Sequence, residues 1–257
     1  MTTMNVSTGI PPDEKALTLF LPFHVTSADA DMNSRLRPGS LVNLLIQSAI
    51  NSADALGFGL QLLRNQNLFW VLSRLSVEIY KPLCWYQSGV VETWPKNLDK
   101  ILYVRDFLVR DQNQEVVARA TSGWLAVDTE SKRPKTFDAI HAPVFTRLKD
   151  KHALSTSPEK LFPVKDGEVF EVKTGYFDID LNGHVTSTRY IDWMMDTFTV
   201  EFHQKNYPSK LSINFLHETK PGETISLVRT SPDEKSFTFE GFNKTSNTFA
   251  FRGYVEF

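Results

Sequence analysis

The chain has a single cysteine, Cys84, lacks any apolar run long enough to cross a membrane, and has no dominant charge, with 28 basic and 30 acidic residues. One cysteine excludes an intrachain disulfide and is typical of a reducing compartment, so we expect a cytoplasmic protein. Residues 1–15 are polar and lack the hydrophobic core of a signal peptide, and we expect a disordered N-terminus there. The balanced charge and the missing apolar run make nucleic acid and membrane unexpected partners.

Two segments about half the chain apart carry nearly the same pattern. Residues 31–36 read DMNSRL and residues 180–185 read DLNGHV. Downstream, residues 74–77 (RLSV) are echoed by residues 210–213 (KLSI). Recurrence of landmarks in the same order indicates duplication, and the length suits two small domains.

The two copies differ at one chemically important position. His184 ends the second motif, whereas Arg35 stands at the equivalent place in the first. Histidine exchanges a proton near neutral pH and arginine does not. We therefore expect the second copy to be reactive and the first to be the remnant of a site, in which Asp31 and Asn33 only shape a turn.

Each half is predicted to contain one long helix and several strands. Apolar residues recur at helical spacing over residues 38–56, with Gly57 as a stop, and over residues 190–202, with Thr186 or Ser187 as N-cap. Strand-like runs lie at 17–25, 70–80, 89–95, 101–110 and 115–127, and again at 169–176, 210–216, 224–229, 236–242 and 248–257. This pattern predicts an α+β fold in which each helix packs on an antiparallel sheet.

The domain organisation follows from these runs. We expect a first unit at residues 16–131 and a second at residues 169–257. Between them, residues 132–168 carry four prolines and mixed charges without a sustained period. Such a segment is typical of a linker.

Several motifs share an order with one known family. Beyond residues 177–185 (FDIDLNGHV) and 189–193 (RYIDW), the matching segments are 70–74 (WVLSR), 91–94 (VETW), 105–111 (RDFLVRD) and 118–120 (ARA). Together they resemble the acyl-ACP thioesterases of plants and bacteria, over most of the chain from about residue 17. The resemblance implies two tandem hotdog domains that hydrolyse the thioester between a fatty acyl chain and acyl carrier protein (ACP), without a cofactor.

By position, the resemblance implies Asp180, Asn182 and His184 as catalytic residues, with Glu218 as the fourth member. Thioester hydrolysis needs a base for the attacking water and stabilisation of charge on the carbonyl oxygen. Glu218 is our candidate base, His184 and Asn182 would position the water or the carbonyl, and Asp180 would orient one of them. Plant members commonly have cysteine directly after the glutamate, whereas this chain has Thr219, which favours direct attack by water.

Other readings of the motif stay open. Backbone amides of residues 184–187, at the start of the second helix, are candidate donors to the carbonyl oxygen. The simplest alternative is a hydrogen-bonded turn that only caps this helix. Asp180, His184 and Glu218 could also bind a metal by ligand type, but no compact ligand motif supports this, and we expect none.

The first half lacks both reactive groups, because the position equivalent to Glu218 falls near Pro82 and His184 is replaced by Arg35. The resemblance implies that this half receives the acyl chain. Candidate pocket residues, with ordinary core packing as the alternative, are Leu45, Phe58, Phe69, Trp70 and Leu72. ACP is acidic, so its docking surface should be basic, and the candidates are Arg35, Arg37, Arg64, Lys132, Arg133 and Lys135.

Three alternative functions fit the same features: an acyl-CoA thioesterase, a dehydratase or hydratase on the same fold, and a protein that binds acyl thioesters without turnover. The sequence leaves the preferred acyl-chain length and saturation open. It also leaves open whether the protein is a monomer or a homodimer.

Overall fold

In a computed structural model, residues 13–136 and 142–257 are described. The first half contains β1 (Leu19–His24), α1 (Pro38–Ala55), α2 (Leu60–Asn65), β2 (Leu68–Ile79), β3 (Ser88–Asp99), β4 (Leu102–Asp111) and β5 (Val116–Asp128). The second half contains β7 (Glu168–Lys173), α4 (Ser187–Asp196), α5 (Val200–Lys205), β8 (Lys210–Phe215), β9 (Thr224–Thr230), β10 (Ser236–Asn243) and β11 (Thr248–Glu256). Between the halves lie β6 (Pro134–Lys135) and α3 (Ala142–Thr146), and the short 3-10 helices η1 (Glu14–Leu17) and η3 (Tyr176–Asp178) precede β1 and α4.

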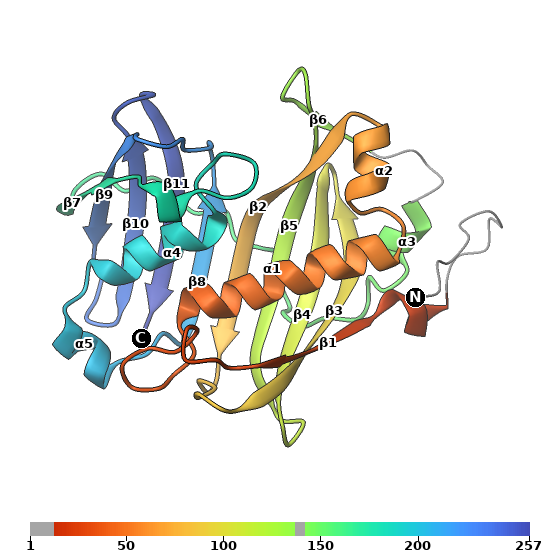
Figure 1. Cartoon of the computed structure of the whole chain (residues 1–257), viewed down its shortest axis with the longest axis horizontal. Helices are drawn as coiled ribbons and strands as arrows, with labels where there is room; N and C mark the ends of the chain where they lie inside the picture. Colours follow the sequence, from red (N-terminus) through yellow and green to blue (C-terminus); the bar gives the residue numbers. More distant parts are fainter. Residues whose placement is uncertain (1–12, 137–141) are drawn as a thin grey trace.

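The strands of the described residues form one antiparallel sheet in the order β1-β3-β4-β5-β2-β8-β11-β10-β9-β7, with β6 paired to β5 (Figure 1). The order within the second half repeats that of the first, reflected about the seam between β2 and β8. At the seam, Ser76 lies opposite Ser212 and their hydroxyl groups are 3.0 Å apart. The α+β fold class expected from the sequence is confirmed, and the recurring motifs correspond to recurring topology.

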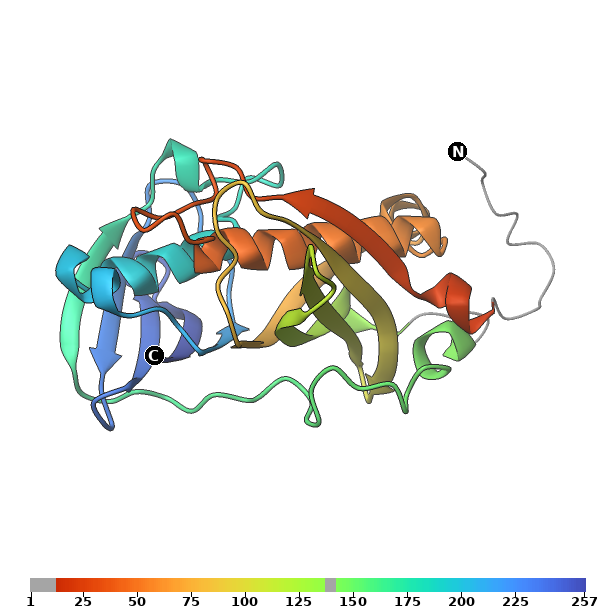
Figure 2. The same cartoon turned by 90° about the horizontal axis from the view of Figure 1, so that it is seen from below.

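The helices lie on one face of this sheet (Figures 1 and 2). The predicted helix at 38–56 is observed as α1, which ends before Gly57 at a φ of +80°. The second predicted helix is interrupted: α4 ends at Asp196, and Thr199 caps a separate α5 by accepting a hydrogen bond from the Phe202 amide. Helices α1 and α4 meet end to end, where a side chain on Gly39 would collide with Asp192.

The opposite face of the sheet is crossed by residues 148–165, which we call the strap (Figure 2). Asn214 on β8 holds it by two hydrogen bonds of 2.8 Å, to the Leu161 amide and the Glu159 carbonyl. Farther along, the Ala153 amide donates to Asp106 on β4 at 2.7 Å. The expected linker therefore contains a segment that is bonded to both halves.

The N-terminal region is described only from residue 13. Most of the disordered segment expected at residues 1–15 lies outside the described residues. Glu14 and Lys15 instead belong to η1, because Leu17 is completely buried beside Trp94 and anchors this turn. Among the helices of the described residues, none is long and apolar enough to cross a membrane.

Candidate functional site

The two sequence motifs fold into the same turn. Asp31 and Asp180 each accept hydrogen bonds from the backbone amides of the second and fourth residues that follow. These distances are 2.8 and 2.8 Å around Asp31, and 2.8 and 3.3 Å around Asp180. In both turns the third following residue has a positive φ, +61° at Ser34 and +80° at Gly183. Both aspartates thus hold a turn through bonds within the motif. The simplest reading expected the turn to cap the following helix, but the N-cap residues of α1 and α4, Arg37 and Thr186, make no side-chain cap hydrogen bond.

The second turn brings His184 to Glu218. Nε2 of His184 lies 3.2 Å from Oε2 of Glu218. Strand β8 ends just before Glu218, and the Val185 amide donates to the Thr219 carbonyl at 2.8 Å, which fastens the two loops together. The side chains of His184 and Glu218 are 32% and 51% exposed. A base and an imidazole are thus in hydrogen-bond reach and open to solvent.

The other two candidates support the turn. Nδ2 of Asn182 lies 3.4 Å from Oδ2 of Asp180, and the Asn182 side chain is exposed beside the His184–Glu218 pair. The bonds of Asp180 go to its own turn, so its carboxylate fixes the backbone that carries His184. Asn182 is left facing solvent, where an amide could contact a substrate.

Most of the candidate oxyanion donors are already in use. The His184 amide donates to Asp180, the Val185 amide to the Thr219 carbonyl, and the Thr186 amide to the Asp178 carbonyl. Of the four amides at residues 184–187, that leaves the amide of Ser187, the first residue of α4, without a hydrogen-bond partner in the described structure. The sequence could not separate these amides, because the direction of each N–H depends on the closed turn.

The corresponding site in the first half is closed. Arg35, in place of His184, pairs with Asp31 and donates to the carbonyl groups of His203 and Asn206. Its guanidinium lies 5.0 Å from the ring centre of Tyr207, whose hydroxyl donates to the Leu36 carbonyl. Arg35 is thus held inside the protein, and we do not retain it among the residues that could meet a partner.

Two models of one protein family match most of the chain. The acyl-ACP thioesterase N-terminal domain matches residues 21–141, and the acyl-ACP thioesterase C-terminal domain matches residues 163–252. The chain belongs to the acyl-ACP thioesterase family. Hydrolysis of fatty acyl-ACP thioesters, the function expected from the sequence, is the function of this family.

Individual relatives have low sequence identity to this chain but match most of its length. Oleoyl-acyl carrier protein thioesterase 2 of Arabidopsis thaliana is 24% identical over 88% of this chain and 67% of its own length. The palmitoyl-acyl carrier protein thioesterase of Gossypium hirsutum is 25% identical over 83% of this chain, which spans only 55% of that relative.

Solved structures share the whole fold. An acyl-ACP thioesterase from Bacteroides thetaiotaomicron is 26% identical, with a TM-score of 0.87 over 95% of this chain and 99% of its own. The 12:0-ACP thioesterase from Umbellularia californica, at 21% identity, has a TM-score of 0.82 over 93% and 96%. The tandem hotdog fold expected from the resemblance is confirmed.

Thr219 occupies the position at which plant members of the family commonly carry cysteine. Its side chain is completely buried and faces the hydroxyl of Tyr190. Burial raises the pKa of Tyr190 to about 12. The Thr219 hydroxyl thus faces the interior of the second half, whereas His184 and Glu218 face solvent.

An ionic network fixes the catalytic turn on α4. Nε of Arg189 lies 2.7 Å from Asp178 before the turn, and its Nη1 lies 2.8 Å from Asp192 on the helix. Burial raises the pKa of Asp192, against the opposing effect of Arg189. The start of the helix is therefore tied to both sides of the turn.

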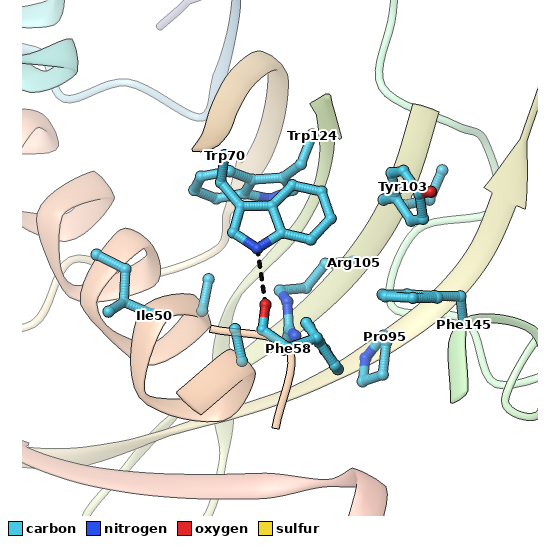
Figure 3. Close-up of a pocket in the computed structure, with 11 residues that line it drawn as sticks. Ile50, Phe58, Trp70, Pro95, Tyr103, Arg105, Trp124 and Phe145 are labelled. Atoms are coloured by element: carbon cyan, nitrogen blue, oxygen red, sulfur yellow. Dashed lines mark hydrogen bonds between the residues drawn. The ribbon is translucent and has the colours of Figure 1, made fainter. Parts of the chain in front are cut away.

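An apolar pocket lies in the first half, between α1, α3 and the sheet (Figure 3). It holds about 430 Å³ of empty space, part of it continuous with solvent. Two of the predicted residues, Phe58 and Trp70, line it, and the Trp70 indole donates to the Phe58 carbonyl at 3.1 Å. Of the other predicted residues, Leu45 and Leu72 are buried elsewhere in the first half and Phe69 lies under Lys132.

Sequence reasoning did not single out four further residues of this pocket. They are Tyr103, Arg105, Trp124 and Phe145. Arg105 is buried, and its Nη1 donates to the hydroxyl groups of Ser52 at 2.9 Å and Thr93 at 3.2 Å. Burial lowers the pKa of Arg105 to about 9. Alternation along β4 and β5 could have indicated Tyr103 and Trp124, whereas nothing in the sequence marks Phe145.

Arg64, Lys132, Arg133 and Lys135 lie around the start of β2, whereas Arg37 precedes α1. Arg64, Lys132 and Arg133 are exposed, Lys135 pairs with Asp128, and Arg37 donates to the Ala30 carbonyl at 2.9 Å. Because β2 and β8 are antiparallel, the start of β2 and the end of β8 share one end of the sheet. In the described part of the chain, no group of three or more histidine, cysteine, aspartate or glutamate side chains is placed to hold a metal ion.

Proposed function

We propose that this protein hydrolyses fatty acyl-ACP thioesters by direct attack of water, with Glu218 as general base. The observation that carries the proposal is the pair formed by His184 and Glu218, 3.2 Å apart and open to solvent. Family membership supports the same reaction. A buried Thr219 next to Glu218 supports water rather than a side chain as the nucleophile.

Glu218, His184, Asn182 and the Ser187 amide would account for each proton transfer and charge in the reaction. Glu218 takes a proton from water as the water oxygen attacks the carbonyl carbon. His184, with its proton on Nε2, donates to Glu218 and holds the carboxylate in place. Asn182 and the Ser187 amide stabilise the negative charge that develops on the carbonyl oxygen. The carbon–sulfur bond then breaks, and protonated Glu218 returns its proton to the sulfur, which gives a free fatty acid and a thiol.

The acyl chain is proposed to lie in the pocket of the first half. Aromatic side chains provide most of its wall, with Phe58 and Phe145 ring centres 4.7 Å apart and those of Trp70 and Tyr103 5.0 Å apart. Apolar surface of this kind suits a hydrocarbon chain. The first half would thus hold the chain while the second hydrolyses the thioester.

The basic side chains near the start of β2 are proposed to attract acidic ACP. Arg64, Lys132 and Arg133 are exposed at the end of the sheet where β8 delivers Glu218. Steering by these charges would speed the encounter with ACP. We also propose a cytoplasmic location, supported by the single cysteine. Pairing of β2 with β8 within one chain supports a monomer, with the homodimer as the alternative.

The experiment is a thiol-release assay with the same acyl chain on ACP and on pantetheine, over several chain lengths. We expect wild-type protein to release thiol, and Glu218→Gln to lower kcat by about two to four orders of magnitude with an unchanged melting temperature. His217→Ala is the matched control, because His217 adjoins Glu218 but binds the Phe249 carbonyl. Near wild-type turnover in Glu218→Gln would refute the assigned role, and an enoyl product would indicate a dehydratase.

A further inference from the structure

Three large apolar side chains project from the segment that carries the catalytic turn. Tyr176, Phe177 and Leu181 are 87%, 90% and 93% exposed. We call these three residues the apolar rim. The rings of Tyr176 and Phe177 pack edge to face with centres 5.3 Å apart. Adjacent apolar side chains so fully in water are typical of a surface that meets a partner.

The apolar rim is built into the catalytic site. Leu181 lies within the turn itself, and η3 carries Tyr176 and Phe177 directly before it. The Thr186 amide donates to the Asp178 carbonyl at 2.8 Å, so η3 is bonded to the start of α4. In Figure 1 this segment leads into α4 at the outer face of the second half. The apolar rim therefore borders the turn that carries His184.

Two lysines flank the apolar rim, and two acidic side chains near them have bonding partners. Among the described residues, the exposed side chains of Lys173 and Lys220 have no ion pair. By contrast, Glu171 pairs with Lys244, and the carboxylate of Glu223 accepts from the Lys220 amide at 2.7 Å. The Thr174 hydroxyl donates to the Lys220 carbonyl, so the two lysines belong to one surface. Beside the apolar rim, Lys173 and Lys220 thus place positive charge without an ion-pair partner, whereas the carboxylates of Asp180 and Glu218 belong to the candidate site itself.

We propose that the apolar rim, with Lys173 and Lys220, is the docking surface for the acidic carrier protein, a proposal that rests on the proposed function. An acidic partner complements the two free lysines, and apolar side chains at its contact face would cover Tyr176 and Phe177. The carrier then sits over His184 and Glu218 while its thioester arm enters the site. A thioester without a carrier protein does not contact this surface.

The first half of the repeat offers a matched control. Trp85 and Tyr86 are also consecutive aromatic residues, 42% and 71% exposed, and their rings stack with centres 4.4 Å apart. They lie beside the closed turn of the first half, because the Trp85 amide donates to the Ser34 carbonyl. Removing this pair changes a similar apolar area at a site without catalytic groups.

The experiment compares kcat/KM for one acyl chain carried by ACP and by pantetheine. In the double variant Tyr176→Ser/Phe177→Ser we expect the ratio of the ACP value to the pantetheine value to fall about tenfold, through KM for acyl-ACP. The Trp85→Ser/Tyr86→Ser variant should keep the wild-type ratio. Lys173→Glu/Lys220→Glu should lower the ratio and weaken its dependence on salt.

The outcomes separate this proposal from the one on which it rests. An unchanged ratio in the Tyr176→Ser/Phe177→Ser variant overturns the docking surface, as does an equal fall in the control. Wild-type protein that hydrolyses acyl-pantetheine but shows no preference for acyl-ACP also overturns it. Wild-type protein that hydrolyses neither substrate refutes the proposed function instead.

Discussion

At the scale of residues, the repeat shows how one backbone turn serves two purposes. Asp31 and Asp180 make the same bonds to their turns, so the turn by itself carries no chemistry. The difference lies in the residue at its end. His184 contacts Glu218 at the surface, whereas Arg35 pairs with Asp31 and donates hydrogen bonds to backbone carbonyl groups. The exchange of His184 for Arg35, together with the lack of a glutamate equivalent to Glu218 in the first half, separates the candidate pair from a structural ion pair.

This comparison gives a prediction for the two aspartates. Asp31→Ala and Asp180→Ala each remove two hydrogen bonds to the backbone, and we expect each to lower the free energy of unfolding by about 2 kcal/mol. Asp31→Ala should cost more than this, because it also removes the ion pair with Arg35. Only Asp180→Ala should also lower kcat, because it releases the turn that positions His184. Urea denaturation and thiol release measure the two effects. A comparable loss of kcat in Asp31→Ala would contradict the division between the halves.

At the scale of elements, the strap is the feature that the sequence did not indicate. Polar side chains on the face of the sheet opposite the helices are buried because residues 148–165 cover them. Lys96 and Asp106, for example, form a buried ion pair at 2.9 Å, and Lys96 also donates to the Leu154 carbonyl. The strap crosses the seam, so it connects the halves on one face as α1 and α4 do on the other (Figure 2).

Asn214 tests the contribution of the strap. Asn214→Ala removes two part-buried hydrogen bonds to the Leu161 amide and the Glu159 carbonyl, so we expect the free energy of unfolding to fall by about 1–2 kcal/mol. Limited proteolysis should become faster within residues 155–165, and kcat should change little. Asn113→Ala, in an exposed turn, is the control. Unchanged stability in Asn214→Ala would show that the strap is held by other contacts.

At the scale of the whole molecule, buried tyrosines control stability in alkali. Burial raises the pKa of Tyr190 to about 12, and it also raises the pKa of Tyr207. Above pH 10 the unfolded chain therefore loses protons that the folded protein retains, and stability falls as pH rises. Arg105 has the opposite effect, because burial lowers its pKa to about 9. Above pH 9 the unfolded chain therefore holds a proton that the folded protein loses, and this contribution to stability rises with pH.

Tyr190→Phe isolates one of these effects. Between pH 10 and 12, Tyr190 lowers the free energy of unfolding by up to about 1.4 kcal/mol for each unit by which the pH rises. The Tyr190→Phe variant lacks this loss. We expect melting temperatures of the variant and the wild type to converge or cross as pH rises from 8 toward 11. Parallel curves over this range would show that Tyr190 ionises alike in both states.

The sequence by itself determined the repeated topology and indicated the candidate catalytic residues. Alternating and helical periods depend on neighbouring residues, so the strands and α1 could be located to within a few residues. The turn at Asp180 is also local, because its bonds reach no farther than four residues. Glu218 was placed by resemblance to a family, since no local rule links it to His184.

Only the tertiary structure decided which groups meet across the chain. Tyr207, far along the chain, closes the first turn. The second predicted helix is divided at Thr197, and Phe145 reaches the apolar pocket from a distant segment. Residues that seem equivalent in the sequence, such as Arg35 and Arg64, differ in availability because one is enclosed and the other is exposed. Burial and partner choice depend on packing between segments far apart, and such long-range contacts leave no period in the sequence.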